Sequence, residues 1–255
     1  MITLLDGSQW EKQDLIKEMV KDEFYYGYLS KAALSSSSLK LLLNSPKTYK
    51  HVTEYGNPES QALRDGWLFH TAILEPDVFN AQVFVDVASK NTKAYKLAKE
   101  EHGKVFTMTE KKDAERLADA FLRNEKALQL IQQSEFEVPM IGEVMGMPFR
   151  GKADVLGKNG IVDLKTTTDI KAFKYSAMKY GYSVQCYLYC ELFGVDYKDF
   201  TFLALDKGSL DIAVYHCSEE FYLDGKQKTE KAIETYDTYF LQAADLDQYY
   251  IEGIL

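Results

Sequence analysis

GKADVLGKNGIVDLKTT, residues 151–167, alternates apolar and polar side chains on either side of an Asn-Gly pair. This alternation predicts two antiparallel strands, and Asn159-Gly160 is a dipeptide favoured in two-residue type I′ hairpins. If these two residues form the loop, Asp154 lies opposite Lys165 across the strand pair. A slip of one residue would send the side chains to the other face of the sheet, so the register decides whether the stretch forms a site.

Strand periodicity places Asp154, Asp163 and Lys165 on one face of the predicted hairpin. The two carboxylates are then diagonal neighbours, roughly 7–8 Å apart at the backbone, and their side chains can close onto a shared ion. Carboxylate oxygens hold Mg²⁺ or Mn²⁺ with coordination positions left for water and a phosphate oxygen. Lys165 could orient or deprotonate the attacking water, or stabilise phosphate charge. The trio predicts phosphodiester hydrolysis.

An isolated Asp-x-Lys pattern also fits a weak ion pair on a half-exposed strand. The residues around it favour the other interpretation, because Ile161, Val162 and Leu164 are all apolar. A strand of this kind is expected to be buried in the centre of a sheet, where two charged side chains need a reason to be present.

The whole chain predicts an α/β fold with a mixed central sheet flanked by helices and an N-terminal helical extension. Helical patterns and capping residues predict helices within 35–44, after Ser45, over 62–76, from Thr107 to about Gln133, over 170–179 and 183–193, and from Ser218 onward. Strands are expected over 83–85, within 136–166, and at about 199–206 and 210–217.

The composition of the 255 residues, 46% hydrophobic and 27% charged, is that of an ordinary globular protein. The first residues show no basic segment followed by an apolar run, and no later stretch approaches the roughly 18 apolar residues that cross a bilayer. A cytoplasmic location, in a bacterium or a phage-infected host cell, is therefore expected.

The net charge of −9 is unfavourable for a nucleic-acid partner, because duplex binding draws much of its affinity from lysines and arginines. Lysines are nevertheless dense over 90–104 and 165–179, and acidic residues gathered at a metal site would lower the total. These lysine runs also fit solvated helix faces. Charge alone does not exclude DNA.

The three cysteines, Cys186, Cys190 and Cys217, form no Cys-x-x-Cys pair. They are too few for a four-thiolate cluster, so no iron–sulfur cluster is expected. Cys186 and Cys190 are expected to be core residues on one face of a helix.

Four motifs together resemble the PD-(D/E)XK nuclease superfamily in the form found in RecB-like and RecE-like enzymes. GKADVL followed by VDLKTT resembles the hallmark hairpin. DGWLFHTAILEP resembles the Gly-x-x-x-His helix through Gly66 and His70, and GYSVQCYLY resembles the Gln-x-x-x-Tyr helix through Gln185 and Tyr189. The RecE type, that of exonuclease VIII, is the most similar.

The resemblance runs from about Leu34 to Phe193 and includes SSSSLKLLLNSPKTYK, which looks like the opening helices of the family. One departure is that Ala153 stands where the hallmark has proline. Proline is not a ligand, so the departure casts little doubt on the site.

The resemblance implies that His70, Asp154 and Asp163 ligate Mg²⁺ or Mn²⁺, with two ions expected per site and the backbone carbonyl of Leu164 as a further ligand. Lys165 becomes the catalytic lysine. Without the matching hairpin, His70 on an apolar helix would more often be a hydrogen-bonded core histidine.

The resemblance also implies that Gln185 and Tyr189 position the lysine, the water or the DNA backbone. Four residues apart, they share one helix face. An ordinary half-buried helix face remains an equal alternative for this pair.

A single nuclease domain is expected over 1–255, with a mainly helical part (1–134) that supplies His70, a catalytic part (135–217) and a C-terminal helix and tail (218–255). The RecE resemblance implies processive 5′ to 3′ degradation of linear double-stranded DNA that leaves 3′ overhangs for phage-type recombination. It also implies a ring-shaped homo-oligomer, with a homotetramer favoured, and a RecT-like single-strand annealing protein as partner.

Two other functions fit the same motifs. A RecB-like repair nuclease, or an endonuclease, would use the same site with another end preference, and cleavage of closed circular DNA would distinguish them. A catalytically silent DNA-binding or assembly module would bind DNA without cutting it. For the nuclease, Asp163→Ala or Lys165→Ala is expected to abolish cleavage while the fold survives.

Overall fold

The computed structural model describes residues 1–252, so the end of the predicted C-terminal part, 253–255, lies outside the described residues. Its helices are α1 (Lys12–Glu18), α2 (Leu29–Ala32), α3 (Ser36–Asn44), α4 (Pro46–Tyr55), α5 (Gln61–Leu74), α6 (Pro76–Asn80), α7 (Lys93–His102), α8 (Met108–Arg123), α9 (Glu125–Ile131), α10 (Phe173–Lys179), α11 (Tyr182–Phe193) and α12 (Glu219–Tyr236). Its strands are β1 (Ile2–Thr3), β2 (Gln9–Trp10), β3 (Phe84–Val85), β4 (Phe106–Thr107), β5 (Glu135–Val144), β6 (Met147–Gly157), β7 (Gly160–Thr167), β8 (Phe200–Asp206) and β9 (Ile212–His216).

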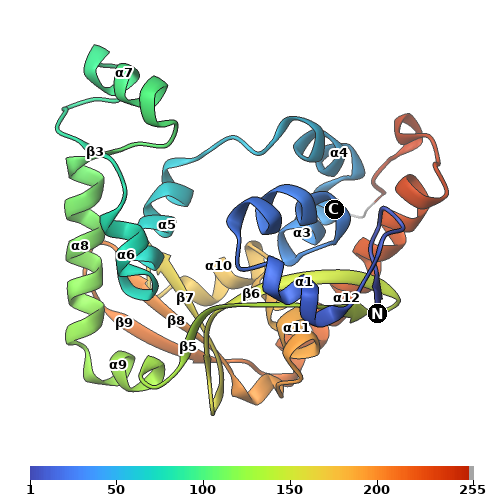
Figure 1. The fold of residues 1–255 in the computed structure, drawn as a ribbon. Helices are drawn as coiled ribbons and strands as arrows, with labels where there is room; N and C mark the ends of the chain where they lie inside the picture. The colour runs from blue at the N-terminus through green and yellow to red at the C-terminus, as the bar shows by residue number, and fades with distance from the viewer. Residues whose placement is uncertain (253–255) are drawn as a thin grey trace.

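The centre of the fold is a five-stranded sheet in the order β5-β6-β7-β8-β9 (Figure 1). The pair β7–β8 is parallel and the other three pairs are antiparallel. The connection from β7 to β8 contains α10 and α11, as a parallel pair requires a crossover. The mixed sheet flanked by helices confirms the α/β prediction, and β7, which carries Asp163 and Lys165, is its central strand.

Two apolar clusters hold helices on opposite faces of the sheet, with α8 and α9 on one side and α11 and α12 on the other (Figure 1). Ile161 and Phe202 belong to the cluster with α3, α4, α11 and α12. Val162 and Leu164 belong to the cluster with α5, α8 and α9. The alternation along β7 therefore buries both faces of this strand, as its apolar run predicts.

The turn between β6 and β7 differs from the sequence-based prediction. The type I′ geometry, with positive φ at both central residues, occurs at Met145 (φ 51°) and Gly146 (φ 77°), which join β5 to β6. The β6–β7 loop is Lys158-Asn159, because Gly157 pairs with Gly160. The prediction of Asn159-Gly160 as the loop is wrong.

Gly160 explains this shift in register. It has φ 117°, and an added Cβ would overlap the main chain of Asp199, just before β8. The glycine therefore permits close approach of a neighbouring segment and is not a turn centre. The register of β6 against β7 is shifted by two residues from the prediction. Val155 pairs with Val162, so the next positions along the two strands are Asp154 and Asp163. The prediction set Asp154 opposite Lys165. A shift of two keeps each side chain on its predicted face.

The helix predicted from Thr107 to about Gln133 is two helices. Thr107 and Glu110 form the predicted capping box at the start of α8. Asn124 then leaves the helical conformation, with ψ 109°, and its side chain accepts a hydrogen bond from the N–H of Ala127 to cap α9. The amphipathic pattern continues from α8 into α9, so the pattern does not reveal the break at Asn124.

An ion pair at the start of α5 fixes the helix that carries His70. Arg64 and Glu110, both buried, are joined by a bond from Nε to Oε1 of 2.8 Å, and Arg64 also donates to the carbonyl of Val105 at 2.7 Å. Glu110 in turn accepts from the N–H of Thr107 at 2.7 Å. These bonds tie α5 to the first turn of α8, since charge-assisted bonds of this geometry are among the stronger ones.

The N-terminal segment forms a further layer against the edge of the sheet. Its apolar residues, among them Leu15 and Leu29, pack with Ile141 of β5. Leu34 exchanges main-chain hydrogen bonds with the start of β6, accepting from Arg150 at 2.8 Å and donating to Pro148 at 2.9 Å. Among residues 1–252, none of the helices has the length and apolar character needed to cross a bilayer.

Candidate active site

A cavity of about 880 Å³ lies between α3, α5, α10, α11 and the strands β6 and β7. His70, Asp154, Lys165, Gln185 and Tyr189 all line it. Gly66, the other residue of the predicted Gly-x-x-x-His helix, lines it as well. The four motifs, far apart in sequence, therefore meet at one cavity.

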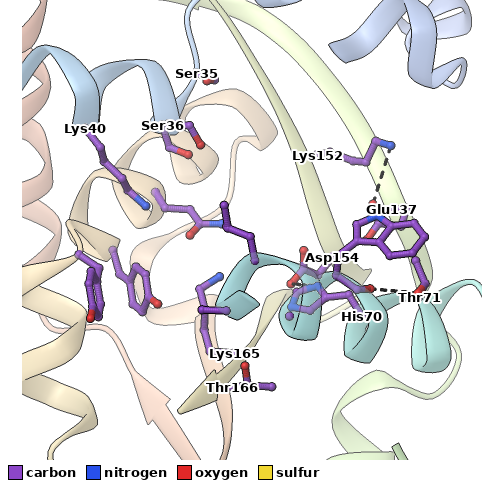
Figure 2. A pocket seen from close by; sticks show the side chains of 18 of the residues that line it. Ser35, Ser36, Lys40, His70, Thr71, Glu137, Lys152, Asp154, Lys165 and Thr166 are labelled. Atoms are coloured by element: carbon purple, nitrogen blue, oxygen red, sulfur yellow. Dashed lines mark hydrogen bonds and ion pairs between the residues drawn. The ribbon is translucent and has the colours of Figure 1, made fainter. Parts of the chain in front are cut away.

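His70 and Asp154 face each other on the α5 side of the cavity (Figure 2). Nδ1 of His70 lies 3.4 Å from Oδ2 of Asp154, and the side chains are 24% and 13% exposed. The same Asp154 oxygen accepts a hydrogen bond of 2.8 Å from the N–H of Leu164. The structure thus places a half-buried imidazole beside a carboxylate held by the central strand.

The carbonyl of Leu164 faces β6, the strand that carries Asp154. In an extended strand the N–H and C=O of one residue point to the same side, because paired residues exchange both bonds. Since the N–H of Leu164 points at Asp154 on β6, its carbonyl oxygen faces β6 too. The position suits the predicted role of this carbonyl as a ligand.

Asp163 and Lys165 lie next to each other on β7 and form an ion pair. Asp163 is fully buried, and its Oδ1 accepts a bond of 2.6 Å from Nε2 of Gln185 on α11. Lys165 also lies over the ring of Tyr182, 5.1 Å from its centroid. Gln185 therefore positions the carboxylate of Asp163, whereas the sequence predicts contact with the lysine, water or DNA.

Tyr189, also on α11, bonds to β6, whereas Gln185 bonds to β7. Its hydroxyl donates to the carbonyl of Lys152 on β6 at 3.0 Å. The side chain is buried, and it ties the helix to the strand that carries Asp154. Gln185 and Tyr189 thus both connect α11 to the β6–β7 hairpin, Gln185 through Asp163 and Tyr189 through Lys152.

Glu137 on β5 is a residue that the sequence motifs miss. Ligand atoms of His70, Glu137 and Asp154 all lie within 4.8 Å of one another, and Figure 2 shows the three on the same side of the cavity. Asp163 does not belong to this group, so the predicted set of His70, Asp154 and Asp163 is not brought together as one cluster. Asp154 lies beside His70 and Glu137, and it is also the position on β6 opposite Asp163 on β7.

Burial and neighbouring charges shift the pKa values of the ionisable groups in the site. Burial, with Asp154 nearby, raises the pKa of Asp163 to about 6 despite the pull of Lys165. Burial and Asp154 likewise raise the pKa of Glu137 to about 8. Burial would lower the pKa of Lys165, but the carboxylates of Asp163 and Asp154 outweigh it and raise this pKa. Carboxylates crowded out of water favour a cation among them.

The donor set fits Mg²⁺ or Mn²⁺. Carboxylate and carbonyl oxygens are the ligands that these ions prefer, and an imidazole is compatible with Mn²⁺. Asp154, Asp163 and the carbonyl of Leu164 would hold the ion, with the imidazole of His70 beside Asp154. The cysteines take no part, because Cys186 and Cys190 are core residues of α11, as predicted, and Cys217 is buried as well.

The chain is similar to solved structures. A candidate exonuclease from Eubacterium rectale has a TM-score of 0.60 with this chain at 15% identity, over 98% of this chain and 97% of that one. A phage-related exonuclease from Haemophilus somnus 129PT is more distant, with a TM-score of 0.36 and 16% identity over 83% and 96% of the two chains. At these identities the likeness to the first shows a shared fold. No curated protein matches the chain.

The sequence also matches a family over most of its length. The family is described as a PDDEXK-like domain of unknown function (DUF3799), and the match covers residues 35–243. This range includes the opening helices, the hallmark hairpin, and the helices of His70 and Gln185. The chain therefore belongs to the PDDEXK-like DUF3799 family, and its resemblance to the PD-(D/E)XK superfamily is confirmed.

Proposed function

We propose that this chain is a Mg²⁺- or Mn²⁺-dependent exodeoxyribonuclease that degrades linear double-stranded DNA. The observation that carries the proposal is the convergence of Asp154, Lys165 and, from helix α5, His70 at one cavity, with Asp163 buried beside it and paired with Lys165. Two carboxylates and a lysine largely buried on the neighbouring strands β6 and β7 lower the stability of the fold. Their chemistry matches phosphodiester hydrolysis.

The cavity favours a nucleic-acid backbone in spite of the net charge of −9. Four lysines and an arginine line it, namely Lys40, Lys152, Lys165, Lys207 and Arg150. Burial, with Lys165 nearby, lowers the pKa of Lys40 to about 8. Four acidic residues line the cavity as well, namely Asp22, Glu75, Glu137 and Asp154. A phosphate between Lys40 and Lys165 would nevertheless relieve the repulsion between these two lysines, and such a local contact does not require a basic surface elsewhere.

Each residue has a defined task in the proposed reaction. Asp154 and Asp163 hold the divalent ion, and the ion when bound makes hydroxide available near neutral pH and neutralises phosphate charge. Lys165 donates hydrogen bonds to the scissile phosphate or to the attacking water. Gln185 keeps Asp163 in place through its bond of 2.6 Å, and Tyr189 keeps β6 against α11.

The finer assignment rests on the RecE resemblance. We propose processive 5′ to 3′ degradation that leaves 3′ overhangs, which a RecT-like single-strand annealing protein would use in recombination. A ring-shaped homo-oligomer, with a tetramer favoured, would retain DNA topologically.

The test is a time course with the purified chain on end-labelled linear duplex and on covalently closed duplex, each with Mg²⁺, Mn²⁺ or EDTA. The linear DNA is expected to be degraded from its 5′ ends to mononucleotides, the closed DNA to remain intact, and EDTA to stop the reaction. The label released at each end reports the polarity directly.

Each other outcome identifies a competing function. Nicking or linearisation of closed DNA would identify an endonuclease, and degradation from 3′ ends would indicate a RecB-like end preference. DNA that is bound and left uncut with every ion would contradict catalysis and favour the silent binding module.

A further inference from the structure

Helix α10, which lies between β7 and α11 along the chain, exposes large apolar side chains to solvent. Tyr175 is 68% exposed, Met178 is 45% exposed, and Tyr180, directly after the helix, is 54% exposed. Single exposed apolar residues are ordinary, but large ones gathered on one short segment mark an interaction site. These three residues, with the lysines around them, form what we call the α10 face: Lys171, Lys174, Tyr175, Met178, Lys179 and Tyr180.

The three lysines of the α10 face carry positive charge that acidic side chains do not balance. All three are exposed, and within the described residues, 1–252, none of them takes part in an ion pair. Over 165–182 the sequence has four lysines against one acidic residue, Asp169. Nζ of Lys174 lies 5.1 Å from the ring centroid of Tyr175. Although the whole chain has a net charge of −9, this face combines positive charge with exposed aromatic rings.

The α10 face continues into the cavity of the candidate active site. Tyr180 and Ser176 both line this cavity. The ring of Tyr180 lies 6.2 Å from the ring of Tyr182, measured between centroids. Nζ of Lys165 in turn lies 5.1 Å from the centroid of Tyr182. Aromatic rings therefore lead from the exposed face to the lysine of the site.

This combination of side chains suits single-stranded DNA better than duplex DNA. An aromatic side chain stacks on any base whose face is accessible, while lysines contact the phosphates. Inside a duplex the bases are stacked on each other, so a duplex would use the lysines and leave the tyrosines exposed.

A protein occupant fits the α10 face less well. Lysine is depleted in protein–protein interfaces, whereas three lysines surround the apolar side chains of this face. A second copy of the chain, docked through the same face about a two-fold axis, would place lysines against lysines.

We propose that the α10 face binds single-stranded DNA, with Tyr175 and Tyr180 stacking on unpaired bases and the three lysines contacting phosphates. The face holds an unpaired strand at the mouth of the cavity. This inference rests on the proposed function, and it adds a binding surface outside the residues that carry out the hydrolysis.

The test is fluorescence anisotropy of the full-length chain with a labelled oligothymidylate and with a blunt duplex of the same length. EDTA is present throughout, so that no DNA is cut. Tyr175→Ala and Tyr180→Ala are each expected to weaken binding of the oligothymidylate by at least about 5-fold, the lower end for the loss of one base–aromatic stack. Duplex binding is expected to stay unchanged. Tyr175→Phe keeps the ring and should bind as wild type does.

Tyr55→Ala is the matched control. Tyr55 is also an exposed tyrosine on a helix, at 75%, and it does not line the cavity. This variant should bind the oligothymidylate with wild-type affinity. Lys174→Gln should lower the slope of log Kd against log salt by about 0.7, the value for one phosphate contact on a single strand. Equal melting temperatures should show that every variant keeps the fold.

Two results would overturn the inference. The first is a wild-type chain that does not bind the oligothymidylate, or tyrosine variants that bind it with wild-type affinity. The second is a smaller assembly of Tyr175→Ala in sedimentation velocity with unchanged oligothymidylate binding, which would identify the face as an interface between copies.

Failure of the inference and failure of the proposed function give different results. Wild type that degrades linear DNA, while the tyrosine variants bind the oligothymidylate normally, would refute only the role of the α10 face. Wild type that binds the oligothymidylate through Tyr175 and Tyr180, yet cuts no DNA with any ion, would refute only the nuclease.

Discussion

Replacing Lys165 with alanine is expected to lower the cleavage rate of linear duplex at saturating Mg²⁺ by at least about 10³-fold, the scale seen when one preorganised donor to a transition state is removed. Lys165 is paired with Asp163 and only 16% of its side chain is exposed, so no neighbouring lysine can take its exact place without rearrangement. The rate is to be measured in single turnover, with DNA binding measured separately in Ca²⁺.

Lys158→Ala is the control for this experiment. Lys158 lies in the exposed loop of the same hairpin, so its loss should leave the rate within a factor of a few of wild type. A Lys165→Ala rate within 10-fold of wild type would show that the lysine is not catalytic.

Asp163→Ala is a poorer test than the sequence suggests. Asp163 is fully buried against Lys165, and removing it leaves a buried ammonium without its partner. Such a loss typically costs about 3–5 kcal/mol of stability. Loss of activity in this variant would therefore not separate the site from the fold, whereas Asp163→Asn keeps the shape and the bond to Gln185.

Replacing Gly225 with alanine is expected to destabilise the fold by about 3 kcal/mol or more, at the upper end for overpacking. Gly225 lies where α12 crosses α11, and an added Cβ would overlap the carbonyl of Ser183 and lie 2.9 Å from Cβ of Tyr187. Backbone cannot move aside as a flexible side chain can. Because α11 carries Gln185 and Tyr189, displacement of α12 also disturbs the support of the hairpin.

The measurement is urea unfolding followed by circular dichroism, with expression level recorded if the variant does not fold. Gly66→Ala is the matched control, since an added Cβ in α5 meets nothing within 4 Å. Alanine there should leave stability equal or raise it by up to about 1 kcal/mol through helix propensity. A Gly225→Ala protein as stable as wild type would contradict the packing described for α11 and α12.

The hairpin shows how far the sequence determines the site. Alternation along 151–167 is enough to place Asp154, Asp163 and Lys165 on one face, and an error of two residues in register preserves that face. The register of β6 against β7 depends on Gly160. A glycine is required there because the main chain of Asp199 approaches too closely for a Cβ. That contact joins residues far apart in sequence, so local turn preferences could not reveal it.

Glu137 was within reach of the sequence. A two-residue loop at Met145-Gly146 fixes the β5–β6 register, and counting pairs back from it places Glu137 opposite Asp154. The signal was missed because glutamate on an edge strand ordinarily faces solvent. The hydrogen bond from Gln185 to Asp163 could not be predicted from the sequence, because it depends on how α11 packs on the sheet.

The helices were predicted best where capping residues mark their ends. Ser45 and Ser218 each cap the helix that follows them, as predicted, and within the serine run at 35–38 it is Ser35 that caps α3. The break at Asn124 was missed because the hydrophobic pattern runs on from α8 into α9. The division into parts 1–134, 135–217 and 218–255 stays a prediction.

The most direct measurement of the central claim is anomalous X-ray scattering from crystals of the wild-type protein grown with Mn²⁺. The claim is that the carboxylates of the β6–β7 hairpin hold a divalent ion. It predicts a manganese peak bonded to an oxygen of Asp154, with Asp163 as a ligand. Crystals that contain Mn²⁺ at concentrations supporting cleavage, yet show no peak at Asp154, would contradict it.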